Sequence, residues 1–269
     1  MAIHIALAGN PNCGKTTMFN ALTGANQYVG NWPGVTVEKK TGKLKDASGE
    51  EVNVTDLPGV YSLSPYTLEE VVTRDFILKE NPDVIVDLVD ATNIERNLYL
   101  TTQLIETGIP VVIALNMCDL LKKNGINIDV KALSKKLGCP IIETSALKKT
   151  GLKEVIAEAI KVAKDHAAGT VSAIFEDSVE DKVSAIEAEL PSSIPDAEKR
   201  WYAIKVLEND SKVAEQLGLS ADNRFSRYTK ELEKKFDDDA ESVITDQRYV
   251  YIQKVIEETV KKPAQRMSL

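Results

Sequence analysis

The sequence predicts an α/β domain, built on a mostly parallel sheet with helices on both faces, followed by an all-helical domain. Short apolar runs alternate with amphipathic helical patterns up to about residue 165, which is typical of a doubly wound parallel sheet. A glycine-rich segment joins the first apolar run to the first helical pattern, at the sheet edge where such folds bind ligands. Beyond residue 166, strand-like runs are scarce and helical spacing dominates.

Five apolar runs are the expected strands of the sheet. Those at residues 83–91 and 110–116 are nearly continuous in apolar residues, as parallel strands buried on both faces tend to be. The five runs lie at residues 3–8, 51–56, 83–91, 110–116 and 139–146. The expected helices between them begin at Lys15 and cover residues 71–80, 97–108 and 130–138.

The helical domain is expected to follow a short linker. Residues 166–173 are small and weakly patterned, so we assign residues 1–165 to the α/β domain and 166–269 to the helical part. Apolar residues then recur at helical spacing in three groups. These are Trp201, Ile204 and Leu207; Tyr228, Leu232 and Phe236; and Tyr249, Ile252, Val255 and Ile256.

Composition excludes several classes of protein. With 43% hydrophobic residues, 28% charged residues and a net charge of −8, the 269-residue chain resembles a soluble globular protein without a nucleic-acid partner. Cys13, Cys118 and Cys139 form no C-x-x-C pair, so neither disulfides nor a zinc site are indicated and a cytosolic compartment fits best. No apolar run reaches the roughly 20 residues that span a bilayer.

The segment from Gly9 to Thr17 has the spacing Gly-x-x-x-x-Gly-Lys-Thr of a phosphate-binding loop, here called the P-loop. Gly14 opens a helix whose N-terminus, with several backbone N–H groups, favours an anion. Lys15 is expected to reach the β- and γ-phosphates, and the Thr16 hydroxyl to bind Mg²⁺. The expected nucleotide contacts are Gly9, Asn10, Pro11, Asn12, Cys13, Gly14, Lys15, Thr16 and Thr17.

A second motif, DLPG, ends the strand at residues 51–56. Asp56 is placed to bind Mg²⁺ through a water molecule, and the Gly59 amide to contact a γ-phosphate. Alone, Asp-x-x-Gly is an ordinary turn, but in this position it predicts a sensor of the nucleotide state.

Two further segments predict that the base is guanine. NMCD follows the strand at residues 110–116, and its Asp119 can accept hydrogen bonds from N1–H and the exocyclic amino group of guanine. Adenine lacks that donor pair and would leave the carboxylate unpaired, which gives the discrimination. Asn116, Met117, Ser145 and Ala146 complete the expected base site. Met117 stands where G proteins usually have lysine, so we expect modest affinity and leave some ATP binding open.

These segments, in this order, resemble a translation-factor-related G domain over residues 1–165, a P-loop GTPase fold of the Ras-like kind. Longer stretches narrow the resemblance to the ferrous iron transport protein B (FeoB) family, in which NMxD is usual. They are YVGNWPGVTVEKKTG, DLPGVYSLSPYTLEE and NLYLTTQLIETGIPVVIALNM, with WYAIKVLEND and ITDQRYVYI resembling the family's helical domain.

The resemblance implies a GTPase module on the cytoplasmic face of a membrane-embedded Fe²⁺ transporter. The implied partners are GTP or GDP, the transmembrane region of the same transporter and possibly further copies of the chain. That transmembrane half is missing here, so the chain is expected to be a soluble fragment. The basic end at residues 261–269 is typical of the cytoplasmic flank of a membrane helix.

GTP hydrolysis here requires substitutes for two groups of Ras-like enzymes, the glutamine that orients water and the arginine finger. Val60 occupies the position where Ras-like enzymes place a water-orienting glutamine, and no arginine finger is identifiable. By resemblance, K⁺ takes the arginine's place, bound by the Asn12 side-chain oxygen and by backbone carbonyls near Gly30 and Trp32. Thr36 would be the threonine of switch I that binds Mg²⁺ in the GTP state, and its neighbours Gly34 and Val35 would contact the nucleotide. We therefore predict that Asn12, Lys15, Thr36 and Gly59 take part in catalysis.

Several alternatives stay open. Asn12 could only stabilise a turn, and Trp32 could be an exposed aromatic residue without a catalytic role. Glu69 and Glu70 could position water, although acidic residues at a helix start favour the helix dipole in any case. The chain could also be a stand-alone K⁺-activated GTPase in ribosome or tRNA metabolism, or a binding module whose turnover is incidental.

Overall fold

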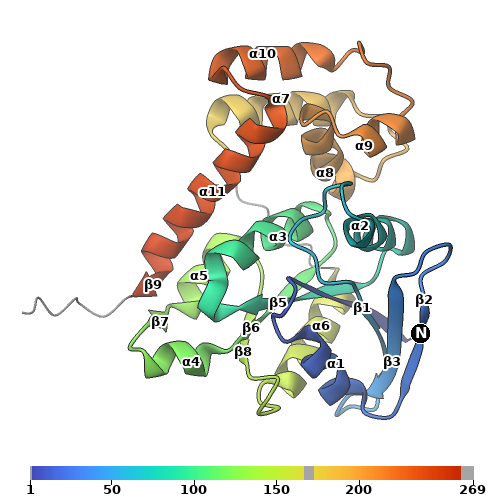
Figure 1. Ribbon diagram of the computed structural model, residues 1–269, viewed down its shortest axis with the longest axis vertical. Helices are drawn as coiled ribbons and strands as arrows, with labels where there is room; N and C mark the ends of the chain where they lie inside the picture. Colours follow the sequence, from blue (N-terminus) through green and yellow to red (C-terminus); the bar gives the residue numbers. More distant parts are fainter. Residues whose placement is uncertain (1, 167–172, 262–269) are drawn as a thin grey trace, which may run out of the picture.

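The computed structural model describes residues 2–166 and 173–261 and confirms the predicted fold class (Figure 1). The predicted linker and the basic C-terminal segment lie almost entirely outside these ranges. A central seven-stranded sheet has the order β2-β3-β4-β1-β5-β6-β8. Its strands are β1 (Ile3–Gly9), β2 (Gln27–Asn31), β3 (Glu38–Lys45), β4 (Glu51–Asp56), β5 (Val84–Asp90), β6 (Val111–Asn116) and β8 (Ile141–Thr144).

The five expected strands form the parallel part of this sheet. β4, β1, β5, β6 and β8 are all parallel to their neighbours within this group. The antiparallel hairpin of β2 and β3 extends the sheet at one edge, and the sequence analysis missed it. Their residues, QYVGN and EKKTGKLK, lack an apolar run because this edge is largely exposed.

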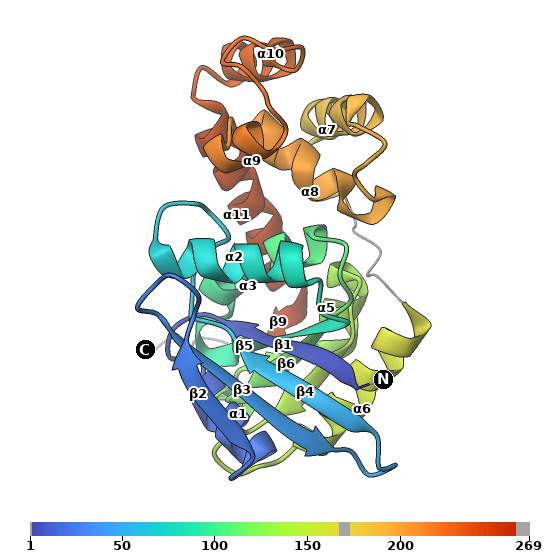
Figure 2. The ribbon, with the colours of Figure 1, turned by 90° about the vertical axis from the view of Figure 1, so that its right-hand side faces the viewer.

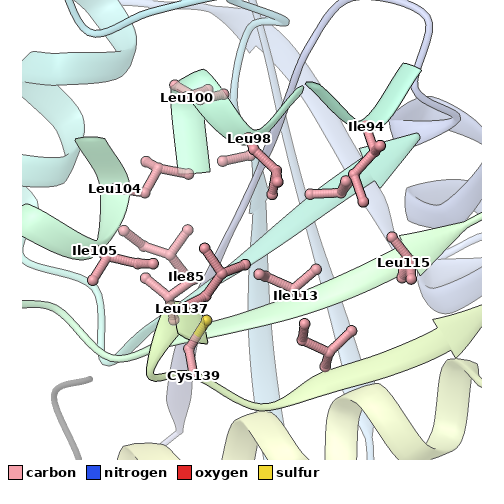
Figure 3. Close-up of a cluster of buried hydrophobic side chains, with 14 of the residues drawn as sticks. Ile85, Ile94, Leu98, Leu100, Leu104, Ile105, Ile113, Leu115, Leu137 and Cys139 are labelled. Carbon is pink, nitrogen blue, oxygen red and sulfur yellow. The ribbon is translucent and has the colours of Figure 1, made fainter. Parts of the chain in front are cut away.

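Helices cover both faces of the sheet (Figures 1 and 2). One face packs against α1 (Lys15–Thr23) and α6 (Leu152–Asp165), and the other against α2 (Leu68–Glu80), α3 (Ile94–Glu106) and α5 (Val130–Leu137). Figure 3 shows the core on the face covered by α2, α3 and α5. There, Ile85 and Ile113 of the sheet meet Leu98 and Leu104 of α3 and Leu137 of α5. The short elements η1 (Ala91–Asn93) and α4 (Cys118–Lys123) follow β5 and β6.

The second part of the chain is helical, as expected. It comprises α7 (Asp177–Glu189), α8 (Asp196–Leu207), α9 (Ser211–Gln216), α10 (Ser226–Phe236) and α11 (Ala240–Thr259). Its core gathers around Trp201, which is 1% exposed, and Ile204 and Leu207 lie beside it on the predicted face of α8. No helix within the described ranges is long and apolar enough to cross a membrane.

Helix α11 returns from the helical domain to the sheet domain (Figure 1). It packs against α3 and α5. Immediately after it, β9 (Val260–Lys261) pairs antiparallel with β7 (Asn127–Ile128), and the Asp129 backbone N–H donates to the Thr259 carbonyl at 2.7 Å. The end of α11 is thus attached to the segment that follows α4.

Two buried ion pairs fix the helical domain on the sheet domain. Arg248 of α11 donates two hydrogen bonds to Glu106 of α3, each 2.7 Å long, and both side chains are at most 1% exposed. Arg74 of α2 donates to both carboxylate oxygens of Asp210, the N-cap of α9, at 2.7 and 2.9 Å. Because an unpaired charge is costly in the interior, these pairs favour one relative orientation of the two parts.

Asp87 is a buried carboxyl in the middle of β5. It is 1% exposed, and burial raises its pKa to about 7. Its Oδ2 lies 2.6 Å from the Thr101 hydroxyl, whose oxygen is also 3.2 Å from the Asn97 carbonyl. The Thr101 hydroxyl is the donor to Asp87, and this hydrogen bond opposes the upward pKa shift that burial causes.

Replacing Asp87 with asparagine is expected to flatten the pH dependence of stability. Between about pH 4 and pH 7 the unfolded chain loses this proton while the folded chain keeps it, so the free energy of unfolding falls by roughly 3–5 kcal/mol as pH rises. Urea unfolding at pH 4.5 and at pH 7.5 measures the difference, which Asp87→Asn should largely remove. Asp75→Asn, at an exposed site on α2, is the matched control. An unchanged pH dependence in Asp87→Asn would contradict the assignment.

Candidate functional site

The candidate site is a cleft of about 570 Å³ at the carboxyl end of the parallel strands. All nine of the lining residues belong to the P-loop or to the DLPG and NMCD motifs predicted to face it. They are Asn10, Pro11, Asn12, Gly14, Lys15, Thr16, Thr17, Gly59 and Met117. A larger groove of about 800 Å³ lies along β3, β4 and the end of α2, but none of the predicted site residues lines it.

Both glycines of the P-loop are required by close packing. A Cβ atom on Gly9 would lie 2.7 Å from the Cys13 sulfur and 2.8 Å from the Leu88 carbonyl oxygen. Gly14 has φ of +96°, and a Cβ there would lie 2.5 Å from the side-chain nitrogen of Asn116. The loop can therefore follow its path only with glycine at these positions.

Asn12 adopts a left-handed conformation, with φ of 65°. Asparagine tolerates this region better than most residues, which is a sufficient local reason for its presence. Its side chain is exposed and lines the cleft. The turn-stabilising interpretation and the cation-binding interpretation are both compatible with this geometry.

Lys15 and Asp56 form an ion pair inside the site. The Lys15 ammonium donates to Asp56 Oδ1 at 2.5 Å, and the two side chains are 10% and 7% exposed. Burial raises the pKa of Asp56, and the nearby Lys15 opposes this shift. The lysine predicted to bind phosphate and the carboxylate predicted to bind Mg²⁺ are therefore in direct contact.

The DLPG segment is fastened to the P-loop by backbone contacts. The Leu57 N–H donates to the Leu7 carbonyl at 3.0 Å, and the Val60 N–H donates to the Gly9 carbonyl at 3.2 Å. Gly59 lines the cleft, and a Cβ on it would lie 3.0 Å from the Cα of Pro11. The Val60 side chain is 3% exposed and cannot orient a water molecule, in agreement with the sequence analysis.

Asn116 joins three motifs. Its side-chain N–H donates to the Cys13 carbonyl in the P-loop at 3.0 Å, and its Oδ1 accepts from the Ala146 N–H at 3.0 Å. Asn116 thus holds the P-loop and the segment at residues 144–146 together at the end of β6. Ser145 is held beside it by a short bridge to Thr150.

Asp119 has a partner that the sequence analysis missed. The Lys148 ammonium donates to its Oδ2 at 2.5 Å, which holds the pKa of Asp119 below its usual range. The Asp119 side chain is 34% exposed, so in this structure the carboxylate is not the buried group that would discriminate strongly between guanine and adenine. No motif spacing pointed to Lys148, because the contact depends on the path of the chain after Ala146.

Switch I is a β-hairpin in this structure. Gly30 pairs with Lys39 across β2 and β3, and the Trp32 carbonyl accepts from the Val35 N–H at 3.2 Å in the connecting turn. Trp32 is 7% exposed and packs edge-on against Phe76 of α2, with ring centroids 5.4 Å apart, so it is not an exposed aromatic residue. None of the predicted switch I residues lines the cleft; these are Gly30, Trp32, Gly34, Val35 and Thr36.

Glu70 has a structural role at the start of α2. It forms a capping box with Thr67, and its carboxylate also accepts from the hydroxyls of Ser62 and Ser64. These contacts favour the helix-capping interpretation over water positioning. Glu69 is exposed in the first turn of the same helix.

The cysteines show no sign of chemistry. Burial raises the pKa of Cys13 and of Cys118 to about 12, so both remain protonated near neutral pH. Within the described ranges, no three His, Cys, Asp or Glu residues gather as a metal site. The hydroxyl of Thr16 and the carboxylate of Asp56 nevertheless fit Mg²⁺, which prefers oxygen ligands and is usually held by few protein groups together with phosphate and water.

Comparison with known proteins assigns the family. Residues 3–159 match the model of ferrous iron transport protein B, and residues 175–261 match that of the FeoB cytosolic helical domain. The chain belongs to the FeoB family. Within that family it corresponds to the G domain and the helical domain that follows it.

FeoB relatives include longer proteins and solved structures. A Porphyromonas gingivalis protein, described as an Fe(2+) transport protein A/Fe(2+) transporter FeoB fusion, is 39% identical over 275 residues, covering 96% of this chain and 32% of the relative. The chain thus spans about a third of that length. A GDP-bound S. thermophilus NFeoB variant has a TM-score of 0.90 at 46% identity, covering 96% of this chain and 100% of that one.

A second NFeoB structure from S. thermophilus carries a triphosphate analogue. This mGMPPNP-bound form has a TM-score of 0.82 at 47% identity and covers 94% of this chain and 96% of that one.

Proposed function

We propose that this chain binds guanine nucleotides with Mg²⁺ and hydrolyses GTP, and that its nucleotide state regulates Fe²⁺ uptake by the transporter of which it forms part. The observation that carries the proposal is the cleft in which Lys15, Asp56 and Gly59 converge beside the Asn116–Asp119 segment. Solved relatives bound to GDP and to mGMPPNP support the same ligand class. Relatives described as Fe(2+) transporters favour this function over ribosome or tRNA metabolism.

Nucleotide binding would begin by breaking the ion pair between Lys15 and Asp56. The ammonium would turn from Asp56 to the β- and γ-phosphates, and Mg²⁺, held by Thr16, by Asp56 through water and in the GTP state by Thr36, would neutralise phosphate charge. Asp119 would likewise exchange Lys148 for the two guanine N–H donors. The backbone amide of Gly59 would bind the γ-phosphate. Loss of the γ-phosphate on hydrolysis would then release the DLPG segment.

The same proposal includes K⁺ as the source of positive charge. Val60 is buried, and among the residues that the structure describes no arginine or glutamine lines the cleft, so the two residue types that assist Ras-like hydrolysis are not found there. Asn12 lines the cleft with an exposed side chain. To complete the site with carbonyls near Gly30 and Trp32, the switch I hairpin would have to rearrange toward the nucleotide.

We expect GTP turnover to be faster in K⁺ than in Na⁺, and Asn12→Ala to lose this stimulation while nucleotide binding persists. A cation at the transferring phosphate is worth several kcal/mol, so a stimulation of about tenfold or more is expected. Phosphate release is measured in each salt at constant ionic strength, with Asn20→Ala on the exposed face of α1 as the control. Equal rates in both salts would contradict the potassium assignment.

Trp32 should report the rearrangement of switch I. If Thr36 reaches Mg²⁺ in the triphosphate state, the turn that buries Trp32 must open. The fluorescence of Trp32 should therefore shift to longer wavelength with GMPPNP and Mg²⁺ but not with GDP. Of the two tryptophans, Trp201 lies in the helical core and supplies a constant background. Trp32→Phe should remove the change, and identical wild-type spectra in all three states would show that switch I stays in place.

A further inference from the structure

Arg96 lies between the P-loop and the DLPG segment, although none of the nucleotide motifs contains it. It is an exposed residue in the first turn of α3. Its guanidinium carbon lies 3.9 Å from the centroid of the Tyr61 ring. Tyr61, which is 40% exposed, comes two residues after Gly59.

The backbone of Arg96 contacts the P-loop at the same time. Its carbonyl accepts from the side-chain N–H of Asn10 at 3.4 Å. Asn10 is 3% exposed, and within the described ranges its Oδ1 has no hydrogen-bond partner. The Arg96 carbonyl is therefore the hydrogen-bond acceptor that anchors this buried side chain.

The DLPG segment is held on both sides of Gly59. Before it, the Leu57 N–H donates to the Leu7 carbonyl, and after it the Val60 N–H donates to the Gly9 carbonyl. The next side chain, Tyr61, turns outward and lies under the Arg96 guanidinium. This stacking is a third contact on the segment, at its outer end, besides the two backbone hydrogen bonds that flank Gly59.

We propose that Arg96 is a positioning residue for the γ-phosphate sensor: through Tyr61 it holds the Gly59 amide at the cleft before nucleotide binds. This inference rests on the proposed nucleotide-binding function. The Gly59 amide would contact only the γ-phosphate, so loosening it weakens the binding of a triphosphate and leaves the binding of a diphosphate unchanged. A residue that merely stabilised the fold would change both affinities equally.

The test compares two dissociation constants, for mant-GMPPNP and mant-GDP, in the whole chain with Mg²⁺. Arg96→Ala should raise the constant for mant-GMPPNP by about three- to fivefold, the worth of one exposed cation–π contact, with that for mant-GDP unchanged. Tyr61→Ala should produce the same selective loss, and Tyr61→Phe, which keeps the ring, should not. Combining Arg96→Ala with Tyr61→Ala should cost no more than either change alone, because one contact is lost in all three variants.

Arg227→Ala is the matched control. Arg227 also stacks on an adjacent tyrosine, Tyr228, with 4.6 Å from the guanidinium carbon to the ring centroid, but it lies in the helical domain. Its loss should leave both dissociation constants unchanged. The inference is overturned if Arg96→Ala changes neither constant or both equally, or if the two alanine changes add. If the unaltered chain binds neither nucleotide, the proposed function fails instead.

Discussion

Replacing Lys15 with alanine is expected to abolish nucleotide binding. Within residues 2–166 and 173–261 its ammonium is the one side-chain cation that lines the cleft. Each charge-assisted hydrogen bond to a phosphate oxygen contributes about 1.5–3 kcal/mol. Losing two of them would weaken binding by roughly 100-fold or more. The change also leaves Asp56, which is 7% exposed, without its partner and facing the phosphates.

Titration with mant-GDP measures this effect directly. Lys161→Ala removes a lysine that is 66% exposed on α6 and should bind nucleotide as the unaltered chain does. Thermal unfolding of both variants shows whether the fold persists. Binding by folded Lys15→Ala within about threefold of the unaltered chain would exclude the assigned phosphate site.

Breaking the Arg248–Glu106 pair is expected to produce the largest loss of stability. Both side chains are almost completely buried, and removing one partner leaves the other charge in the interior without compensation. The expected decrease in the free energy of unfolding is about 3–5 kcal/mol for Arg248→Ala or for Glu106→Ala. Urea unfolding followed by circular dichroism measures it.

Two further variants separate the ion pair from simple packing. Replacing both partners by apolar residues, Arg248→Met with Glu106→Leu, should recover most of the loss, because no charge is then buried. Asp222→Ala breaks a pair whose side chains are 72% and 85% exposed, and it should change stability by less than about 1 kcal/mol. A double apolar variant as unstable as Arg248→Ala would show that the guanidinium acts through its contacts with Phe175 and Thr102 and not through its charge.

The parallel sheet was predictable because its strands are buried on both faces. β5 is buried at every position, so its sequence is almost continuously apolar. β2 and β3 escaped prediction because they lie at an exposed edge. They are stabilised by pairing with each other, by the pairing of β3 with β4 and by Trp32 beneath the turn. β7 and β9 are two residues each, too short for any periodicity to mark them.

Some residues of the candidate site were likewise predictable from the sequence, and others were not. The grouping of Gly14, Lys15 and Asp56 was predictable because each stands in a motif of fixed spacing at the end of a strand, and the structure brings them together. Their roles toward phosphate and Mg²⁺ stay predictions. Lys148 and Arg96 were not predictable, since each meets its partner through tertiary folding across tens of residues. The resting state of switch I also depends on packing against α2, which no local pattern encodes.

The pairing of β9 with β7 has a mechanical consequence. Because β9 is hydrogen-bonded to β7, a load on the chain at Lys261 would act on this two-residue ladder and on the Asp129–Thr259 hydrogen bond. β7 begins only a few residues after α4, whose first turn contains Asp119. A pull at that end would therefore act on the segment that carries Asp119 as well as on the helical domain.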